Sequence, residues 1–210
     1  MEEWERRFTR LETIDLSFEK NENRLKKALF FSKIKKNDLV LDLFSGRCDT
    51  SYGLHSRGYR IVSGDISLKL LKMNHDVKDK MQLHALQLPF RPNQFRGVII
   101  QGGLHHLGTF GQMVDCLNEV KRVLEPDGYL FISEPADTLL LAIWLLHITR
   151  TGLWRLSSYA RNWYELYRAE EKTHTGYLKN IGRLLDYFRS DWIIEHHRVG
   201  LVTEFFTLRK

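Results

Sequence analysis

The sequence predicts an α/β fold built on a doubly wound sheet of seven strands, mostly parallel, with an antiparallel last strand. Three observations favour this fold. Short apolar runs alternate with helix-like segments over residues 37–135, a rhythm typical of a parallel sheet with right-handed crossovers. Turn residues such as Gly58 and Gly128 separate these segments. The last two strand-like runs are joined only by a turn at Gly200, which favours antiparallel pairing.

Chain length and composition indicate one globular domain. The chain has 210 residues, of which 43% are hydrophobic and 28% charged. The net charge of +6 comes from dispersed Lys and Arg residues, which favours a solvated surface over nucleic-acid binding. Cys48 and Cys116 lack metal-ligand spacing, so we expect a reduced, cytoplasmic protein. The charged N-terminus does not fit a signal peptide, and the longest apolar run, 139–146, is far shorter than the roughly 20 residues that span a bilayer.

The predicted domain has four parts in chain order. Residues 1–36 are expected to form N-terminal helices, 37–135 an α/β core, 136–171 a helical insertion, and 172–210 a closing helix and strand pair. The predicted strands cover residues 39–43, 60–65, 81–85, 98–100, 129–133, 192–199 and 201–208. Asp49 or Thr50 is expected to cap the first core helix, which runs to about Ser56, and Ser67 to cap the second. A third core helix begins near Phe110, and a further helix covers about 175–188.

Polar or small residues stand at the ends of four predicted strands. Asp42 and Gly46 lie at the end of the first strand, and Asp65 lies at the end of the second. His84 and Ala85 lie at the end of the third, and Gln101 at the end of the fourth. Ligands of open parallel sheets bind outside the carboxyl ends of the strands. An acidic residue at the end of the second strand is placed to accept hydrogen bonds from ribose hydroxyls, although Asp65 could instead cap the next helix.

Five short motifs occur in the order and at the spacing of one family. They are VLDLFSG at 40–46, DIS at 65–67, LPF at 88–90 with Phe95 following, LHHL at 104–107, and EVKRVLEPDG at 119–128 with Glu134-Pro135 beyond it. Together they resemble the class I S-adenosylmethionine-dependent methyltransferases, in the small-molecule branch that includes the quinone methyltransferases. The resemblance covers about residues 36–135. It implies a Rossmann-like fold, S-adenosylmethionine as cofactor, and methyl transfer to a small molecule at oxygen or carbon.

The resemblance also implies roles for the cofactor-facing residues. Gly46, with the backbone of Phe44 and Ser45, would face the methionine part of the cofactor, and Asp42 would lie near its amino group. Asp65 would hold the ribose.

Four further positions would contact the rest of the cofactor. Ile66 would pack against the adenine, and Ala85 would offer its backbone to the adenine edge. His84 stands where the family usually has an acidic residue for the adenine amino group, and neutral imidazole can still accept a hydrogen bond. Gln101 would line the floor near the methionyl group.

The methyl acceptor is expected to meet His106 and the insertion. His105 and His106 follow the fourth strand, and we assign His106 as the base that removes the acceptor's proton, with loop packing as the alternative role of the pair. The family usually places a substrate lid at 136–171. Its aromatic and Arg residues fit an aromatic or lipid-like acceptor bearing negative charge, or alternatively the core. The run 139–146 fits a peripheral membrane contact or a dimer contact, and the oligomeric state stays open.

Other functions are weighed on specific residues. A nicotinamide dehydrogenase is disfavoured because G-x-G-x-x-G is absent after the first strand, and a nucleic-acid amino methyltransferase because QGGL stands at 101–104. An RNA or protein acceptor stays open. So does a non-catalytic binding subunit, because Phe44 and Cys48 occupy positions where the family usually has glycine, and His84 one where it usually has an acidic residue.

Overall fold

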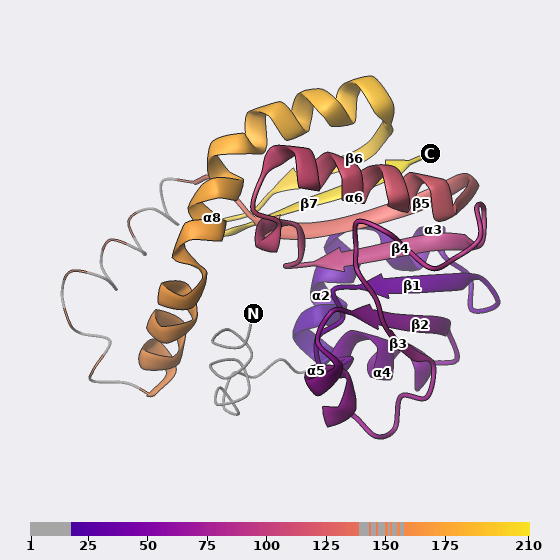
Figure 1. Cartoon of the computed structure of the whole chain (residues 1–210), viewed down its shortest axis with the longest axis horizontal. Coiled ribbons are helices and arrows are strands. Elements are labelled where there is room, and N and C mark those ends of the chain that lie inside the picture. The colour runs from indigo at the N-terminus through magenta and orange to yellow at the C-terminus, as the bar shows by residue number, and fades with distance from the viewer. Residues whose placement is uncertain are drawn as a thin grey trace.

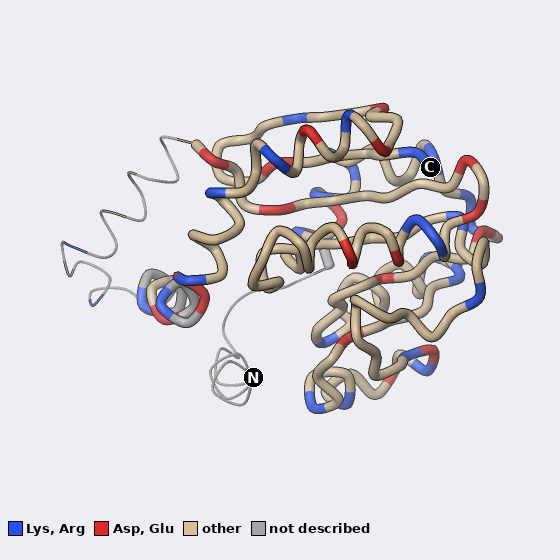
Figure 2. Tube along the Cα trace, turned by 45° about the horizontal axis from the view of Figure 1, so that its top comes forward, with Lys and Arg blue, Asp and Glu red and all other residues tan. Residues whose placement is uncertain are grey.

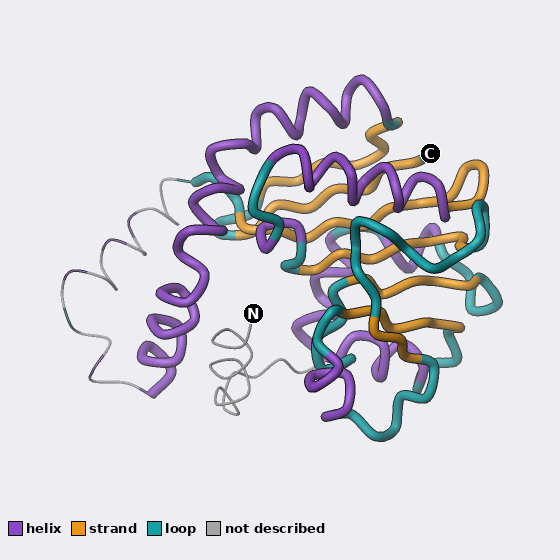
Figure 3. Tube along the Cα trace, viewed as in Figure 1, coloured by secondary structure: helices purple, strands orange, loops and turns teal. Residues whose placement is uncertain are grey.

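The computed structural model describes residues 18–138 and 158–210, together with the single residues 143, 146, 150, 152 and 155. The described chain forms a seven-stranded sheet in the order β3-β2-β1-β4-β5-β7-β6, with helices on both faces (Figure 1). Figure 3 shows the strands side by side as one layer between the helices. The predicted fold class is confirmed.

The strands place five carboxyl ends along one edge. β1 spans Leu39–Leu43, β2 Arg60–Asp65, β3 Lys80–Gln82, β4 Phe95–Gln101, β5 Leu124–Pro135, β6 Ile193–Val199 and β7 Thr203–Arg209. β1 pairs in parallel with β2 and β4, β2 with β3, and β4 with β5. β7 runs antiparallel to both β5 and β6, as predicted for the closing pair. Residues that follow β1 to β5 therefore gather at the same edge of the sheet.

The helices pack on both faces because the central strands are apolar on both sides. The helices are α2 (Phe18–Lys27), α3 (Phe30–Lys33), α4 (Asp49–His55), α5 (Leu68–Met73), the short 3₁₀ helix η1 (Leu104–His106), α6 (Phe110–Val123) and α8 (Ser158–Asp191). On one face, Leu41 and Ile100 belong to a core with Leu117 of α6 and Leu184 of α8. Successive strand residues point to opposite faces, so a strand covered on both sides becomes a continuous apolar run.

The opposite face is covered by the N-terminal helices. Val40 and Ile99 belong there to a second core that includes Leu25 of α2, Phe30 of α3 and Leu54 of α4. α2 therefore completes the hydrophobic core and ends close to the first strand. This agrees with the helical character predicted for 1–36, of which residues 1–17 lie outside the described residues.

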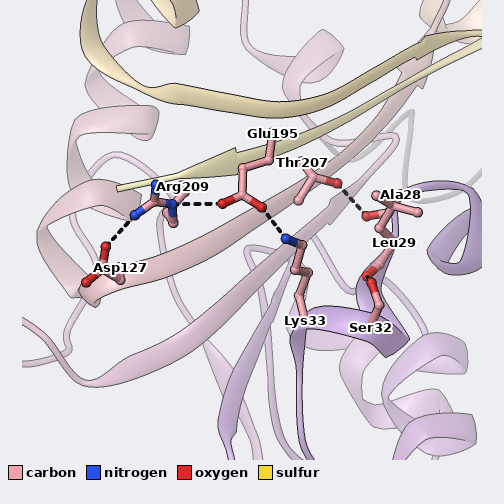
Figure 4. Close-up of polar contacts among 8 residues, drawn as sticks. All are labelled: Ala28, Leu29, Ser32, Lys33, Asp127, Glu195, Thr207 and Arg209. Carbon is pink, nitrogen blue, oxygen red and sulfur yellow. Dashed lines mark hydrogen bonds and ion pairs between the residues drawn. The ribbon is translucent and has the colours of Figure 1, made fainter.

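Polar contacts tie the N-terminal helices to the C-terminal strands (Figure 4). The Thr207 hydroxyl donates to the carbonyl of Ala28, and Lys33 of α3 pairs with Glu195 of β6. Glu195 also accepts from Arg209 Nε at 2.8 Å, and Arg209 reaches Asp127 at 2.6 Å. Such half-exposed pairs stabilise by only about 0.2–1 kcal/mol each, so the packed apolar faces hold the helices in place.

Several predicted boundaries differ from the structure; β4 begins at Phe95 instead of 98, and β5 at Leu124 instead of 129. The third strand covers only Lys80–Gln82, because His84 and Gln87 form an isolated bridge around a turn. The cap of α4 is Cys48, not Asp49 or Thr50, and it uses no side-chain hydrogen bond. The helix expected from about 175 is the second part of α8, which already begins at Ser158.

The charged residues are scattered over the structure, as the dispersed Lys and Arg residues of the sequence indicate. Lys and Arg positions are scattered among Asp and Glu positions along the described trace (Figure 2). Within the described part of the chain, no helix is both long and apolar enough to cross a membrane.

Candidate functional site

The loop after β1 has an unusual backbone. Phe44, Gly46 and Cys48 have φ angles of 62°, 52° and 60°, so every second residue is left-handed. These are the three positions at which the resembled family usually carries glycine. A side chain in this region costs about 1–2 kcal/mol, so the chain keeps the glycine-loop conformation at two strained positions. The ring of Phe44 lies against Gly103, where an added Cβ would be only 2.4 Å from it.

Asp65 joins the end of β2 to this loop. Its Oδ2 accepts from the backbone N–H of Gly46 at 2.8 Å, and its Oδ1 accepts from the N–H of Ser67 at 2.8 Å. The Ser67 hydroxyl in turn accepts from Leu70 N–H and caps α5, as predicted. Asp65 is buried, and each carboxylate oxygen has a second lone pair. The carboxylate can therefore hold the loop and still accept a ligand hydroxyl.

Asp42 near the end of β1 is more deeply buried than Asp65 at the end of β2. Burial raises the pKa of its carboxyl from 3.8 to about 7, against a hydrogen bond from Ser51 that lowers it, while the nearby Asp65 adds a further increase. The Ser51 hydroxyl donates to Asp42 Oδ2 at 2.7 Å from the first turn of α4. A buried carboxyl that titrates near neutral pH is stabilised in its charged form by any cationic ligand group.

Gln101 is the clearest unsatisfied group at this edge. Both polar atoms of its side-chain amide are buried and have no hydrogen-bond partner within the described chain. Leaving such a group unpaired costs about 1–3 kcal/mol. Nearby, a Cβ added at Gly46 would meet nothing within 4 Å, so the loop backbone is open there. The edge therefore offers an open loop and an amide that needs polar partners.

The other residues expected near the cofactor lie around β2 and the turn after β3. Ile66 is 39% exposed directly after Asp65, and the backbone of Ser45 donates to Gly64 of β2 at 3.1 Å. Ala85 is buried. His84 is exposed, and its Nδ1 accepts from Leu86 N–H at 3.2 Å, which stabilises the turn.

A second polar cluster lies where β4 and β5 end. Glu134 Oε1 accepts from the backbone N–H groups of Gly103 and Leu104 at 2.7 and 2.8 Å, and its Oε2 lies 2.7 Å from His105 Nδ1. The Glu134 side chain is fully buried. One carboxylate thus fixes the start of η1 and the ring of His105. The sequence contained this residue in its last motif, but no role was predicted for it.

Glu170 of α8 closes the cluster from the far end of the chain. Its Oε2 lies 3.5 Å from His105 Nε2, and its Oε1 lies 3.9 Å from His106 Nε2. Figure 1 shows α8 passing the edge of the sheet at which β4 and β5 end. No motif pointed to Glu170, because its partners lie more than 60 positions away in sequence.

The two histidines of η1 differ in charge. Burial opposes the positive charge of His105, but Glu134 and Glu170 outweigh it and raise its pKa to about 10. Burial and the charge of His105 lower the pKa of His106 to about 4. His106 is also the more accessible ring, with 27% of its side chain exposed against 6% for His105. At neutral pH His105 is therefore an imidazolium and His106 a neutral imidazole.

The comparisons with known proteins agree with this arrangement. The profile of the family described as "Methyltransferase domain" matches residues 41–132. Demethylmenaquinone methyltransferase of Staphylococcus carnosus is 29% identical over 131 residues, which are 58% of this chain and 53% of that protein. The tRNA (carboxymethyluridine(34)-5-O)-methyltransferase of Arabidopsis thaliana is 29% identical over 124 residues, covering 57% of this chain and 30% of that protein. The chain thus spans about half or less of the relatives it matches.

Solved structures share the fold over most of the chain. A putative S-adenosylmethionine-dependent methyltransferase from Methanococcus maripaludis has a TM-score of 0.63 at 13% identity, covering 96% of this chain and 91% of that one. One from Archaeoglobus fulgidus has a TM-score of 0.61 at 16% identity, covering 97% and 99%. At these identities the likeness shows the fold alone.

Proposed function

The chain belongs to the class I S-adenosylmethionine-dependent methyltransferase family, and we propose that it methylates a small molecule at oxygen or carbon. Membership of this family implies S-adenosylmethionine as the cofactor. The observation that carries the proposal is the bridge from Asp65 to Gly46, which joins an acidic strand end to a left-handed loop. This arrangement offers hydrogen-bond acceptors for a ribose beside an open stretch of backbone.

The residues of the edge fit the parts of this cofactor. The carboxylate of Asp65 would accept from the ribose hydroxyls, and the carboxyl of Asp42 would face the α-amino group. The orphaned amide of Gln101 would gain polar partners from the methionyl group, next to the backbone of Phe44, Ser45 and Gly46. When bound, the cofactor supplies an electrophilic methyl group on a sulfonium. The protein mainly aligns the acceptor with it.

The adenine is assigned to the side of β2 and β3. Ile66 presents an exposed apolar side chain there, and Ala85 follows in the turn after β3. His84 already accepts from Leu86 N–H through Nδ1, so its Nε2–H is a donor and is proposed to meet an adenine ring nitrogen instead of the adenine amino group. In this assignment the ribose at Asp65 lies between the adenine, at Ile66 and Ala85, and the charged methionine end, near Asp42.

His106 is proposed as the base for an acceptor hydroxyl or acidic carbon. A base must be neutral and reachable, and the accessible ring of His106 at the end of β4 meets both needs. Glu134 contacts the ring of the neighbouring His105 and the backbone of Leu104, and so fixes η1, which carries His106. His106→Ala should lower turnover while leaving cofactor affinity unchanged, and the exposed His75→Ala is the matched control.

The acceptor is proposed to be aromatic or lipid-like. Several relatives are named demethylmenaquinone methyltransferases. The predicted lid is 136–171, and most of its residues from 139 to 157 lie outside the described part of the chain. Of this segment, 158–171 belongs to α8, which brings Glu170 to His105. An RNA acceptor is disfavoured because the basic residues are scattered (Figure 2).

The test measures release of S-adenosylhomocysteine from S-adenosylmethionine with a panel of phenols and quinols. Turnover with any of them should fall strongly in Asp65→Asn, because the amide nitrogen cannot accept a ribose hydroxyl, and should persist in the exposed control Asp76→Asn. Equal turnover in both variants would reject the role of Asp65. Cofactor binding without turnover on any small molecule, lipid or RNA would instead favour the non-catalytic binding subunit.

A further inference from the structure

A cluster of potential metal ligands lies at the acceptor side of the edge. Among the residues that the structure describes, His105, His106 and Glu170 bring three ligand atoms within 4.8 Å of one another. Two come from η1 at the end of β4, and the third comes from α8. We propose that these three residues bind a divalent transition-metal ion of the zinc type, with a fourth position open.

The distances fit a site that tightens around an ion. Glu170 Oε2 lies 3.5 Å from His105 Nε2, and Glu170 Oε1 lies 3.9 Å from His106 Nε2. Ligand atoms about 2.0–2.1 Å from a tetrahedral zinc ion stand roughly 3.4 Å apart. His105 and Glu170 already have this spacing, and the remaining ligand atoms, all within 4.8 Å of one another, must draw closer. Glu170 sits on one helix and the histidines on a short loop, so side-chain rotation supplies this movement.

The outer shell of a metal site is already formed. A histidine that ligates through Nε2 usually donates its Nδ1–H to a carboxylate or carbonyl, which fixes the ring. Glu134 accepts from His105 Nδ1 at 2.7 Å and is held in turn by the N–H groups of Gly103 and Leu104. The Nε2 atom of His105 is thereby held facing Glu170, 3.5 Å from its Oε2. An ordinary ion pair between His105 and Glu170 would not require Glu134 as a second, fully buried carboxylate, whereas a metal site would.

The charge of the cluster also calls for a cation. The Glu134 side chain is fully buried and that of Glu170 is 14% exposed, so two carboxylates share a poorly solvated space. Buried carboxylates are retained only with a positive partner. A divalent ion held by His105 and Glu170 would place positive charge beside both glutamates.

The face of α8 that carries Glu170 has further polar groups for a bound ligand. His174 and Tyr177 follow Glu170 at positions i+4 and i+7, on the same side of the helix. The ring of Tyr177 lies 6.5 Å from that of His105, and its buried hydroxyl has no hydrogen-bond partner within the described chain. A water or acceptor oxygen on a bound ion would give this buried hydroxyl a hydrogen-bond partner.

The ion would explain how the acceptor is activated. Two histidines and one glutamate are the ligand set of several catalytic zinc sites, which keep one position for water or substrate. An acceptor hydroxyl at that position would release its proton to water more readily, because the cation stabilises the oxygen's negative charge. In the loaded protein His106 would act as a ligand, and in the ion-free protein as the base. Only this use of the ion rests on the proposed methyl transfer; its binding does not.

The test is calorimetric titration of the chelator-treated full chain with Zn²⁺ alone, without cofactor or acceptor. We expect one ion per chain. Glu170→Gln and His106→Ala should weaken binding by more than the about 10- to 100-fold that loss of an outer-shell partner costs. The neighbouring Glu171→Gln, an exposed residue paired with Arg168, should bind as wild type does.

A spectrum and a melting curve make the result decisive. Co²⁺ in place of Zn²⁺ should give visible absorption bands of a four- or five-coordinate site, and these should vanish in Glu170→Gln but persist in Glu171→Gln. Thermal melts would confirm that the variants fold. Absence of Zn²⁺ binding, or binding equal in Glu170→Gln and Glu171→Gln, would overturn the site. A chain that binds Zn²⁺ but not S-adenosylmethionine would retain this proposal and refute the proposed function.

Discussion

Replacing Asp42 by Asn tests whether the β1 carboxyl is kept for a ligand at the expense of stability. In the folded protein its pKa is about 7 instead of 3.8, chiefly because of burial. The raised pKa means that the folded state holds a proton that the unfolded chain has already released. The contribution of the protonated Asp42 carboxyl to stability is therefore complete below pH 4 and is lost as the pH rises through 7. At 1.36 kcal/mol per pKa unit, the loss is about 4 kcal/mol.

The assay is urea unfolding of the wild type and Asp42→Asn from pH 4 to pH 8. Asn keeps an oxygen for the hydroxyl of Ser51 but carries no titrating proton. The variant should gain stability relative to the wild type steadily between pH 4 and 7, with no further gain above pH 7. The difference between the two proteins cancels the titration of all other groups. A difference that does not change with pH would refute the reasoning.

The same substitution should have the opposite effect on cofactor binding. If the ionised carboxyl faces the cofactor's amino group, wild-type affinity for S-adenosylmethionine should rise about tenfold between pH 6 and 8, as the ionised fraction rises. Asp42→Asn should bind more weakly at pH 8 and without this pH dependence. A site that is more stable but binds less would match the trade-off often found at functional positions.

Three further predictions concern the loop, the cluster and the base. Gly103→Ala should destabilise the fold by about 1–3 kcal/mol in thermal melts, because its Cβ would meet the Phe44 ring at 2.4 Å, whereas Gly111→Ala within α6 should be neutral or stabilising. Glu134→Ala should cost about 3–5 kcal/mol in urea unfolding, because it removes the nearer carboxylate partner of the buried His105 and leaves two backbone N–H groups unpaired; a smaller loss would show that the cluster does not hold η1. His106→Ala should lower kcat by about 10²- to 10⁴-fold in the methyl-transfer assay, and unchanged kcat would make this histidine structural.

The sequence predicted the sheet well because its central strands are buried on both sides. β1 and β4 each contain an uninterrupted apolar run, 39–41 and 98–100, which is typical of a strand covered on both faces. β3 was predicted too far along the chain. Leu83 and Ala85 are buried at the turn after β3. They are two positions apart, as inward-facing residues of a strand are, so the sequence pattern does not distinguish this turn from a strand.

The candidate site was predicted only where it is local in sequence. Asp42, Asp65 and Gln101 each stand at a strand end, so the fold alone brings them to one edge. The left-handed conformation of Cys48 was not predicted, because a non-glycine residue gives no local sign of it. The contact of Glu170 with His105 depends on how α8 crosses the sheet, which no short pattern encodes.

The central claim is that S-adenosylmethionine binds at the carboxyl edge around Asp65. Calorimetric titration of the purified chain with S-adenosylmethionine and with S-adenosylhomocysteine tests it most directly. The account predicts one site for each ligand, weakened by about 1.5–3 kcal/mol in Asp65→Ala, the range for hydrogen bonds to a charged group. Absence of binding at millimolar ligand, or equal affinity in Asp65→Ala, would contradict it.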